Sequence, residues 1–536
     1  MKLLSEVIFD GLNQNKNRLL LADSTGMELN GKKLLIASIL FKEVLKNKLN
    51  EPNIGLIVPT TAAGTMVNLA LMFLGKTLVN INYTMSYEAI KISLQDAKIK
   101  TIITSKKFIE KLASKGLHYH DLFDEYTIIY LEESKQNISK GLVLKTFLSV
   151  SLMPQKYTKA KHIVKKDIND TAIILFSSGS EGKPKGIELS YKNILGNINQ
   201  IRELLDLKDD DVMLGSLPLF HSFGFTVTTF LPLVEGILCV SHSDPTDGYG
   251  IGKLVQKYKS TIMCATPTFL RLYTKDKKVK KTMFKSIKYT VAGAEKLQKN
   301  VRDEFEKKFD KEVIEGYGTT ETSPVISCNI PKYLLENFTL AKGNIHGSVG
   351  LAIPQTDIKI LDPESFEELP LQEAGMICIA GIQVMKGYLN NPSKTDEVIK
   401  IIDNKRYYVT GDKGYIDENG FLTLIDRYSR FAKIGGEMVS LGSVEEKLVG
   451  ILDKYEEIDF AVTSIDDEKK GEKIILLVSG VDESEIDTIK HMMIEHFENK
   501  LMMPHKIIIV DSIAKLGTGK KDFKGIKNQA KAKAFT

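Results

Sequence analysis

The sequence predicts an α/β protein: a large N-terminal domain of parallel α/β sheets that carries a β-rich subdomain, followed by a small α+β C-terminal domain. Three observations lead to this prediction. Short β-branched runs alternate with helical patterns early in the chain, short turn-rich strands follow from residue 343, and the composition changes again after residue 427. At 536 residues the chain is too long for one ordinary core, so two or more domains are expected. We place the boundary after Asp426, which gives domains of residues 1–426 and 427–536.

The first α/β stretch covers residues 54–133. Its expected strands are IGLIVP, TLVNIN, TIITS and YTIIYLEE, and its expected helices are TAAGTMVNLALMFLG and SYEAIKISLQDAK. This alternation is typical of βαβ units on a parallel sheet. The rhythm restarts with the strand TAIILF at residues 171–176, continues through a Gly/Ser/Lys loop and enters a helix, for which Ser190 is the expected N-cap.

The second half of the chain has a different pattern of expected strands, turns and helices. Residues 343–424 contain short strands separated by Gly, Pro and Asp-Glu-Asn-Gly turns, which indicates a β-rich subdomain. Beyond residue 427 we expect a hairpin formed by DFAVTSI and KIILLVSG, then a helix over residues 484–501 and the strand KIIIVDSI. These pieces form the small C-terminal domain.

Charge and cysteine content exclude several function classes. The net charge of +5 comes from interspersed lysines and acids, so nucleic acid is not an expected partner. The exception is the lysine-rich run 515–533, which is either a solvated tail or a contact surface for an acidic partner or membrane lipid. The four cysteines are far apart and lack zinc-site spacing, so reduced structural thiols are expected.

Targeting signals are weak. The N-terminal apolar stretch is too short for a signal peptide, and the most apolar later run, residues 225–240, contains Pro232, Glu235 and Gly236. It is therefore well short of the roughly 20 apolar residues that a spanning helix needs. We expect a cytoplasmic protein, and peripheral contact with the inner face of the membrane stays open.

The loop at residues 177–186, SSGSEGKPKG, is the first candidate for chemistry. It follows a buried strand and precedes a helix, so that backbone N–H groups, hydroxyls and two lysines can converge on an anion. The GxxxxGK[ST] phosphate loop finds no match here. Taken alone, the segment is either a phosphate loop or a plain Gly/Ser-rich surface loop.

Four further segments follow in order. They are EGYGTTETSP at 315–324, YYVTGDKGYID at 407–417, DRYSRFAKIGGEMVSLGSVE at 426–445 and GTGKKDF at 517–523. With the loop, they resemble in order and spacing the motifs of the adenylate-forming superfamily, which includes acyl-CoA synthetases, amino-acid adenylation domains and luciferases. The resemblance implies use of ATP and Mg2+, activation of a carboxylic acid as an acyl-adenylate, and a mobile C-terminal domain that rotates before a thiol attacks.

The resemblance also implies a set of nucleotide-binding residues. A carboxylate that attacks the α-phosphate adds negative charge to a negative group, so Mg2+ and cations must stabilise the transition state. Glu321 is the implied metal ligand, Thr320 the hydroxyl for the α-phosphate, and Tyr317 the side chain on the adenine face; Asp412 and Arg427 are implied for the ribose hydroxyls. The full nucleotide-binding set is Ser177, Ser178, Gly179, Ser180, Gly182, Lys185, Gly293, Ala294, Glu295, Gly316, Tyr317, Gly318, Thr320, Asp412 and Arg427.

Three more residues receive implied catalytic roles, beside Glu321 and Thr320. Lys520 would bridge the acyl carboxylate and the α-phosphate, and Lys433 would face the site during thiol transfer. His221, in LPLFHSFG, would gate the acyl pocket or position the carboxylate, with a packed core histidine as the alternative. The hinge residue of the family is often Asp or Lys, so Ser429 departs from the pattern and leaves the pivot open.

Finer details suggest which acid and which thiol are used. Glu181 stands where the family usually has threonine, and SGSEGxPKG, LPLFHSFG, VAGAEKL, EGYG and FAKIxGEMVSL together resemble the acyl-[acyl-carrier-protein] synthetase region of bifunctional bacterial acyl-ACP synthetase/2-acylglycerophosphoethanolamine acyltransferases. This predicts a long-chain fatty acid ligase that loads holo acyl carrier protein. A long-chain fatty acid–CoA ligase is the alternative. A non-catalytic nucleotide- or lipid-binding relative would be expected to lack Lys520 or Glu321, and both are present.

Overall fold

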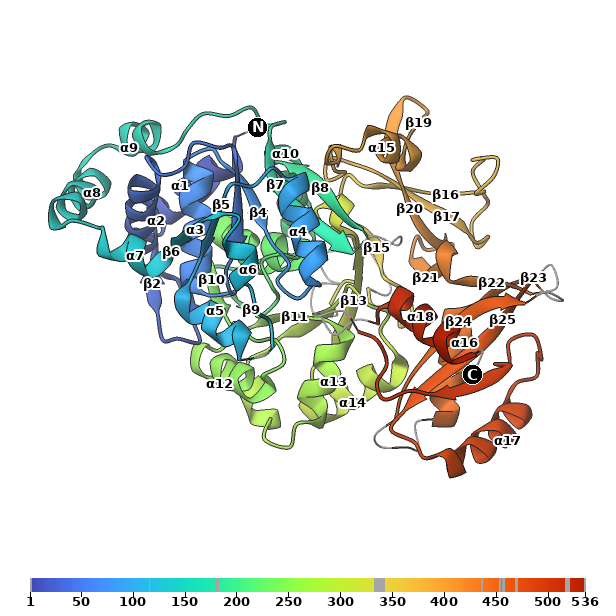
Figure 1. The fold of residues 1–536 in the computed structure, drawn as a ribbon. Coiled ribbons are helices and arrows are strands. Elements are labelled where there is room, and N and C mark those ends of the chain that lie inside the picture. The colour runs from blue at the N-terminus through green and yellow to red at the C-terminus, as the bar shows by residue number, and fades with distance from the viewer. Residues whose placement is uncertain are drawn as a thin grey trace. The chain divides into compact units, whose positions relative to one another are not determined.

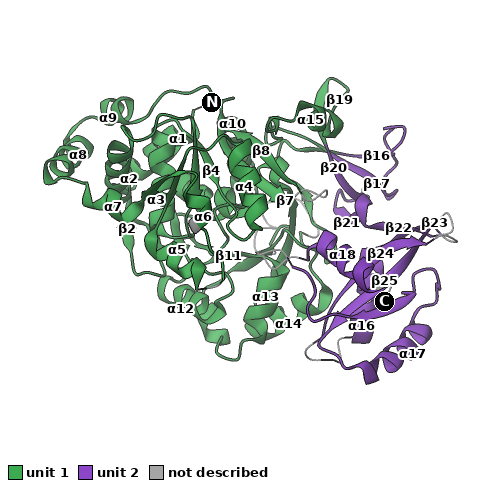
Figure 2. Ribbon diagram, in the orientation of Figure 1, with its two compact units in different colours: residues 1–179, 183–358, 379–408 green, residues 180–182, 359–378, 409–536 purple. Residues whose placement is uncertain are grey.

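The computed structural model describes residues 2–114, 116–178, 183–331, 343–434, 437–452, 455, 458–467, 471–515 and 521–534. The chain forms two compact units (Figure 2). Unit 1 comprises residues 1–179, 183–358 and 379–408, and unit 2 includes residues 359–378 and 409–536. The predicted division into residues 1–426 and 427–536, which rests on a change of composition, stays a prediction.

A nine-stranded sheet forms one half of unit 1. Its six inner strands are parallel, and antiparallel strands flank them on both sides. In spatial order the strands are β15 (Leu351–Ala352), β14 (Val325–Cys328), β13 (Val313–Gly318), β12 (Tyr289–Ala292), β11 (Ile262–Ala265), β9 (Val212–Gly215), β10 (Leu238–Ser241), β1 (Leu19–Asp23) and β2 (Glu28–Asn30). The parallel α/β architecture predicted from the sequence is confirmed.

A seven-stranded sheet forms the other half. Its spatial order is β18 (Gly387–Tyr388), β8 (Pro184–Ser190), β7 (Thr171–Ser178), β4 (Thr77–Asn80), β3 (Asn53–Ile57), β5 (Thr101–Thr104) and β6 (Thr127–Tyr130). The five strands from β7 to β6 are parallel, and each overlaps a run that the sequence predicted as a strand. Strand β8 was not predicted, and it pairs antiparallel with both β7 and β18.

Helices accompany both sheets of unit 1 (Figure 1). They are α1 (Leu4–Gln14), α2 (Gly31–Leu45), α3 (Ala62–Phe73), α4 (Tyr87–Asp96), α5 (Lys106–Ala113), α6 (His120–Phe123), α7 (Leu131–Gln136), α8 (Lys140–Leu152), α9 (Gln155–His162), α10 (Tyr191–Leu205), α11 (Leu231–Glu235), α12 (Gly248–Tyr258), α13 (Pro267–Lys275), α14 (Lys299–Phe309) and α15 (Pro392–Val398). Ser190 caps α10 as predicted, because its hydroxyl oxygen accepts the N–H of Asn193 at 3.1 Å.

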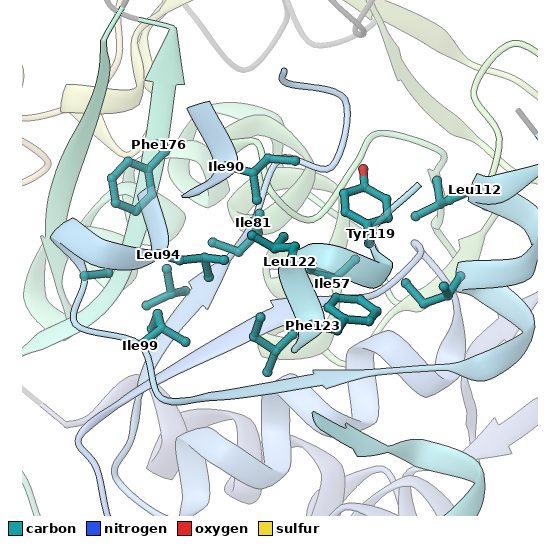
Figure 3. Close-up of a cluster of buried hydrophobic side chains, with 14 of the residues drawn as sticks. Ile57, Ile81, Ile90, Leu94, Ile99, Leu112, Tyr119, Leu122, Phe123 and Phe176 are labelled. Atoms are coloured by element: carbon teal, nitrogen blue, oxygen red, sulfur yellow. The ribbon is translucent and has the colours of Figure 1, made fainter. Parts of the chain in front are cut away.

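A buried apolar cluster supports the strand that leads into the predicted phosphate loop. Figure 3 shows Leu94 of α4, Ile57 of β3 and Phe176 of β7 among its members. Phe176 is 4% exposed and directly precedes Ser177. Strands covered on both faces read as continuous apolar runs, which is why β3, β5 and β7 were recognisable in the sequence.

The predicted β-rich subdomain is present. A five-stranded sheet has the order β16 (Asp357–Leu361), β17 (Gly375–Ala380), β20 (Lys405–Ile416) and β19 (Ile399–Ile402), with β21 (Leu422–Arg427) also paired to β20. Its short strands and Gly-containing turns fit the composition of residues 343–424.

The C-terminal sheet belongs to unit 2. It has the order β23 (Glu437–Ser440), β22 (Phe431–Ile434), β25 (Gly471–Ser479) and β24 (Asp459–Asp467), with β26 (Lys506–Ile509) parallel to β25. The helices of this unit are α16 (Leu441–Leu452), α17 (Ile486–His496) and α18 (Phe523–Ala534). The predicted hairpin and final strand are confirmed, and the predicted helix over 484–501 is shorter than expected.

The interpretation of residues 515–533 as a solvated tail was wrong for most of its length. Residues 523–534 form α18, in which Ile526 and Ala530 are fully buried against the C-terminal sheet. Two of its lysines meet acids of the same unit: Lys527 lies 3.8 Å from Glu472, and Lys531 lies 3.4 Å from Asp466. The apolar residues of the helix were hard to recognise among the lysines. Because two of these lysines are already paired with acids of the same unit, the case for an acidic partner at this run is weakened.

Among the residues that the structure describes, no helix combines the length and the apolar character needed to cross a membrane.

Candidate active site

Several sequence-predicted residues of unit 1 follow strands of the nine-stranded sheet. Strands β9, β11, β12 and β13 are parallel, so their carboxyl ends lie together. The segment containing His221 follows β9, residues 293–295 follow β12, and Thr320 and Glu321 follow β13. In open α/β sheets, ligands bind outside the carboxyl ends of the strands, so this edge is the expected binding site.

Residues 293–295 form a tight turn beside β13. A Cβ on Gly293 would lie 3.1 Å from the ring of Phe223, so glycine permits this close packing. Ala294 has a φ of +70°, a left-handed conformation that non-glycine residues rarely adopt. The carboxylate of Glu295 accepts the N–H and the hydroxyl of Thr268, at 3.3 and 2.7 Å, and thereby fixes the turn to α13.

The EGYGTTE segment bends sharply where β13 ends. A bulge separates Tyr317, which is buried, from Gly318. A Cβ on Gly318 would lie 2.0 Å from the carbonyl oxygen of Pro324, so only glycine fits there. The turn then enters a 3-10 helix, Thr320–Thr322, which begins with a capping box at Thr319. Gly316 is paired with Cys328 across β13 and β14.

Glu321 meets the predicted phosphate-loop region through Tyr388. The phenol of Tyr388 donates to Glu321 Oε1 at 2.9 Å, and the Lys185 ammonium lies 5.7 Å from the centre of the Tyr388 ring. Strand β18 sets this arrangement, because Tyr388 pairs with Ile187 of β8 and Met385 donates its N–H to the Glu321 carbonyl at 2.7 Å. An acid, a phenol and a lysine from three distant segments therefore lie side by side.

The phosphate-loop segment differs from the expected strand–loop–helix arrangement. Ser177 and Lys185 are cross-strand partners in a β7–β8 hairpin, so the loop joins two antiparallel strands and α10 begins only at Tyr191. The expectation that a helix directly follows this segment was wrong, because strand β8 lies between them, whereas the expected anion binding by the loop stays a prediction. Ser178 ends β7. Gly179, Ser180, Glu181 and Gly182 lie outside the described residues.

His221 lies at the start of an unusual helix. Its N–H donates to the Pro218 carbonyl at 3.1 Å, and its ring centre is 4.8 Å from that of Phe220. The following residues, Phe223–Phe230, form a π-helix, a rare form that is frequent at functional sites. His221 is only partly buried, so it is not a fully packed core histidine.

Two predicted ribose ligands are neighbours within unit 2. Asp412 on β20 and Arg427 on β21 are cross-strand partners, and Arg427 Nε donates to Asp412 Oδ1 at 3.0 Å. The arginine side chain is 62% exposed while that of the aspartate is 10% exposed. Lys433 is exposed on β22, whereas Lys520 lies outside the described residues.

The hinge segment of unit 2 is tied to the segment that follows Lys520 in the chain. Arg430 lies 3.1 Å from Glu445, and Lys521 lies 3.0 Å from the same carboxylate. Although burial alone raises its pKa, Lys521 and Arg430 hold the pKa of Glu445 below the ordinary value. The Arg430 guanidinium also stacks on the Phe523 ring at 4.0 Å. These contacts unite residues that are about ninety positions apart.

Sequence reasoning missed two residues at the sheet edge. Tyr388 carries no local signal, because only the pairing of β18 with β8 brings it to Glu321. Glu315 is the first residue of the EGYGTTETSP segment but received no predicted role. A carboxylate in the otherwise apolar strand β13 was the feature that could have drawn attention to it. Burial raises the pKa of Glu315 to about 7, against the lowering effect of the Gly347 N–H and of Arg302.

The described part of this site offers one carboxylate, that of Glu321, to a divalent cation. Mg2+ is commonly held by one or two carboxylates together with substrate phosphates rather than by an all-protein cage. Glu321 supplies such a carboxylate, and the described residues contain no cluster of three or more metal-binding side chains.

Comparison with known proteins agrees with this architecture. Residues 35–389 match the family described as AMP-binding enzyme. The chain is 28% identical to the long-chain-fatty-acid–CoA ligase of Bacillus subtilis (strain 168), over 90% of this chain and 87% of that protein. It is 35% identical to the probable 4-coumarate–CoA ligase 2 of Dictyostelium discoideum, over 54% of this chain and 50% of that protein.

The fold is also found among solved structures. The ATP-bound MatB of Rhodopseudomonas palustris superposes with a TM-score of 0.78 at 21% identity, covering 99% of this chain and 100% of that one. At this identity the likeness concerns the fold. Because the family match covers well over half of the sequence, the chain belongs to the AMP-binding enzyme family.

Proposed function

We propose that the protein is an AMP-forming acid–thiol ligase, which activates a long-chain fatty acid with ATP and then loads it onto the phosphopantetheine thiol of acyl carrier protein. The observation that carries the proposal is the meeting of Lys185, Tyr388 and Glu321 at the carboxyl edge of the parallel sheet. A cation and an acid that would hold Mg2+, placed together, suit a reaction that transfers a nucleotidyl group.

Lys185 and Glu321 would have different roles at the α-phosphate. Lys185 would neutralise phosphate oxygens directly, and Glu321 would hold Mg2+, whose charge offsets the negative charge that builds up as the carboxylate attacks. Tyr388 would keep the Glu321 carboxylate in one orientation through its 2.9 Å hydrogen bond. A fold relative, the o-succinylbenzoate coenzyme A synthetase of Bacillus subtilis, was solved with ATP and magnesium, which supports the use of both by a protein of this fold.

The remaining predicted roles complete the proposal. Tyr317 would pack on the adenine, and the Asp412–Arg427 pair would bind the ribose hydroxyls, since a carboxylate offers two acceptors to a diol. Lys520 would bridge the acyl carboxylate and the α-phosphate during adenylation. Replacing Lys520 with Ala should then abolish adenylation while sparing thioester formation from supplied acyl-adenylate; equal loss in both half-reactions would remove it from this role.

The names of the relatives and the sequence resemblance bear on the identity of the acid and the thiol. The Bacillus subtilis relative is named a long-chain-fatty-acid–CoA ligase, which favours a fatty acid. The same name, and those of the 4-coumarate–CoA ligases, favour coenzyme A as acceptor, so an acyl- or aryl-CoA ligase is the second candidate. The carrier-protein assignment rests on the resemblance carried by Glu181 and the neighbouring motifs.

A competition experiment separates these candidates. The protein is supplied with ATP, Mg2+ and either palmitate or 4-coumarate, and with equal concentrations of holo acyl carrier protein and coenzyme A. Preferential formation of palmitoyl carrier protein is expected. Preferential formation of a CoA thioester would favour the second candidate. If neither palmitate nor 4-coumarate leads to release of AMP, the result would favour a non-catalytic relative.

A further inference from the structure

Helix α8 (Lys140–Leu152) buries Val150 together with two hydroxyl side chains, and it exposes most of its apolar side chains. Thr146 and Ser149 are buried, at 3% and 4% exposure, whereas Leu144 and Leu152 are 59% and 75% exposed. A surface helix normally turns its apolar stripe toward the core and its polar residues toward water. The outward face of α8 therefore needs another explanation than packing within this chain.

The exposed apolar residues form one continuous stripe. Residues three and four positions apart share a helix face, and the exposed positions follow this spacing. The stripe consists of Val143, Leu144, Phe147, Leu148 and Leu152. Tyr157 of α9 (Gln155–His162), which is 65% exposed, follows shortly after it in the chain. Contiguous apolar surface of this kind marks an interaction site more often than scattered single residues do.

The inward side of the hairpin formed by α8 and α9 is well bonded. The hydroxyl of Thr158 donates to the Ser149 carbonyl at 3.1 Å, and the Ser149 hydroxyl lies 3.5 Å from His162 Nε2. Figure 1 shows α8 and α9 together at the outer edge of unit 1. The hairpin is thus held in place by polar contacts, which leaves its apolar side chains on the surface.

The segment of the chain that contains this stripe is rich in lysine. Residues 134–166 contain no Asp or Glu, and they include the lysines 135, 140, 145, 156, 159, 161, 165 and 166. Lys32 of α2 adds a further cation, 4.3 Å from the centre of the Phe147 ring. The nearby acid Asp10 is already paired with Lys159 at 2.9 Å, and Glu43 with Lys42 at 2.8 Å. The local field at this face is therefore positive.

We propose that this face, the apolar stripe of α8 with the lysines of its segment, binds the surface of an anionic phospholipid bilayer. An apolar helix face enters the boundary between headgroups and acyl chains, and lysines beside it meet the anionic headgroups. A partner protein of ordinary composition would complement the leucines and Phe147, but it would leave the lysines of the segment without opposite charge. This inference concerns a surface distinct from the sheet edge and is independent of the proposed reaction.

Vesicle sedimentation tests the proposal with the full chain and no substrate. Vesicles of phosphatidylcholine alone are compared with vesicles containing 30 mol% phosphatidylglycerol, at low and at high salt. The wild-type protein should sediment with the anionic vesicles only, and less at high salt. The double variant Leu144→Asp, Leu152→Asp should weaken binding at least tenfold, and Lys140→Glu should weaken it about fivefold or more.

A matched control and a second measurement make the result decisive. Leu371→Asp removes another exposed leucine, 60% exposed and in unit 2, and should bind vesicles like the wild type with an unchanged melting temperature. Equal binding of the α8 double variant, or no binding to anionic vesicles, would overturn the proposal. A wild-type dimer in light scattering that the double variant abolishes would also overturn it, since a second copy would then cover the face.

Discussion

Replacing Tyr388 with Phe isolates the contact that joins the two halves of the candidate site. The change removes the hydroxyl that donates to Glu321 Oε1 at 2.9 Å, but keeps the ring beside Lys185 and the backbone pairing with β8. A hydrogen bond to a charged group contributes about 1.5–3 kcal/mol. Glu321 is only partly buried, so water can replace some of this bond and the lower end applies. We therefore expect roughly a tenfold loss in kcat/KM for Mg-ATP.

The assay is acid-dependent pyrophosphate release at varied Mg-ATP and varied free Mg2+. Tyr407→Phe is the matched control, because it removes a phenol–carboxylate hydrogen bond of 2.7 Å to Asp357 in the same unit but outside the candidate site. The control should lose stability without losing affinity for Mg-ATP. Wild-type kinetics in Tyr388→Phe, with both variants folded, would refute the positioning of Glu321 by this tyrosine.

Three further predictions concern substitutions of single residues. Burial raises the pKa of Glu315 from its ordinary 4.5 to about 7. The free energy of unfolding should therefore fall by on the order of 3 kcal/mol as pH rises from below 4.5 through 7. Denaturant titrations at several pH values should show a smaller dependence of this free energy on pH in Glu315→Gln. Burial raises the pKa of Glu445, but Lys521 and a neighbouring arginine outweigh burial and hold this pKa below its ordinary value. The stabilisation from ionised Glu445 is therefore present above the unfolded-state pKa and is lost as pH falls through the folded-state pKa. Glu445→Gln should cost about 3–5 kcal/mol and lower the melting temperature of unit 2, and an unchanged melting temperature would contradict this. Gly318→Ala should abolish adenylation and lower stability, because its Cβ would lie 2.0 Å from a backbone oxygen. Gly141→Ala on helix α8 is the control, because its Cβ would have open space around it. In thermal melts this control should be neutral or stabilising by about 0.5–1 kcal/mol.

The sequence predicted the parallel sheets because their strands are buried on both faces. β3 and β5 are continuous apolar runs bounded by polar residues, and the helices between them have strong caps such as Thr61 and Ser86. These signals are local, so they survive without knowledge of the fold. Helix α18 also had a local signal, since Phe523, Ile526 and Ala530 keep helical spacing, but the surrounding lysines obscured it.

Long-range pairing explains what the sequence did not predict. Strand β8 alternates polar and apolar residues and is defined by its partners, so PKGIELS reads as part of the loop when taken alone. Tyr388 reaches Glu321 only because β18 pairs with β8. Of the candidate site, the sequence could therefore predict the acid and the lysine, but not the tyrosine that joins them.

Pyrophosphate exchange into ATP, measured without any thiol, tests the central proposal most directly. The account predicts exchange that requires both palmitate and Mg2+, and that falls at least a hundredfold in Glu321→Ala with a changed magnesium dependence. Exchange that proceeds without any carboxylic acid, or an unchanged magnesium dependence in Glu321→Ala, would contradict it.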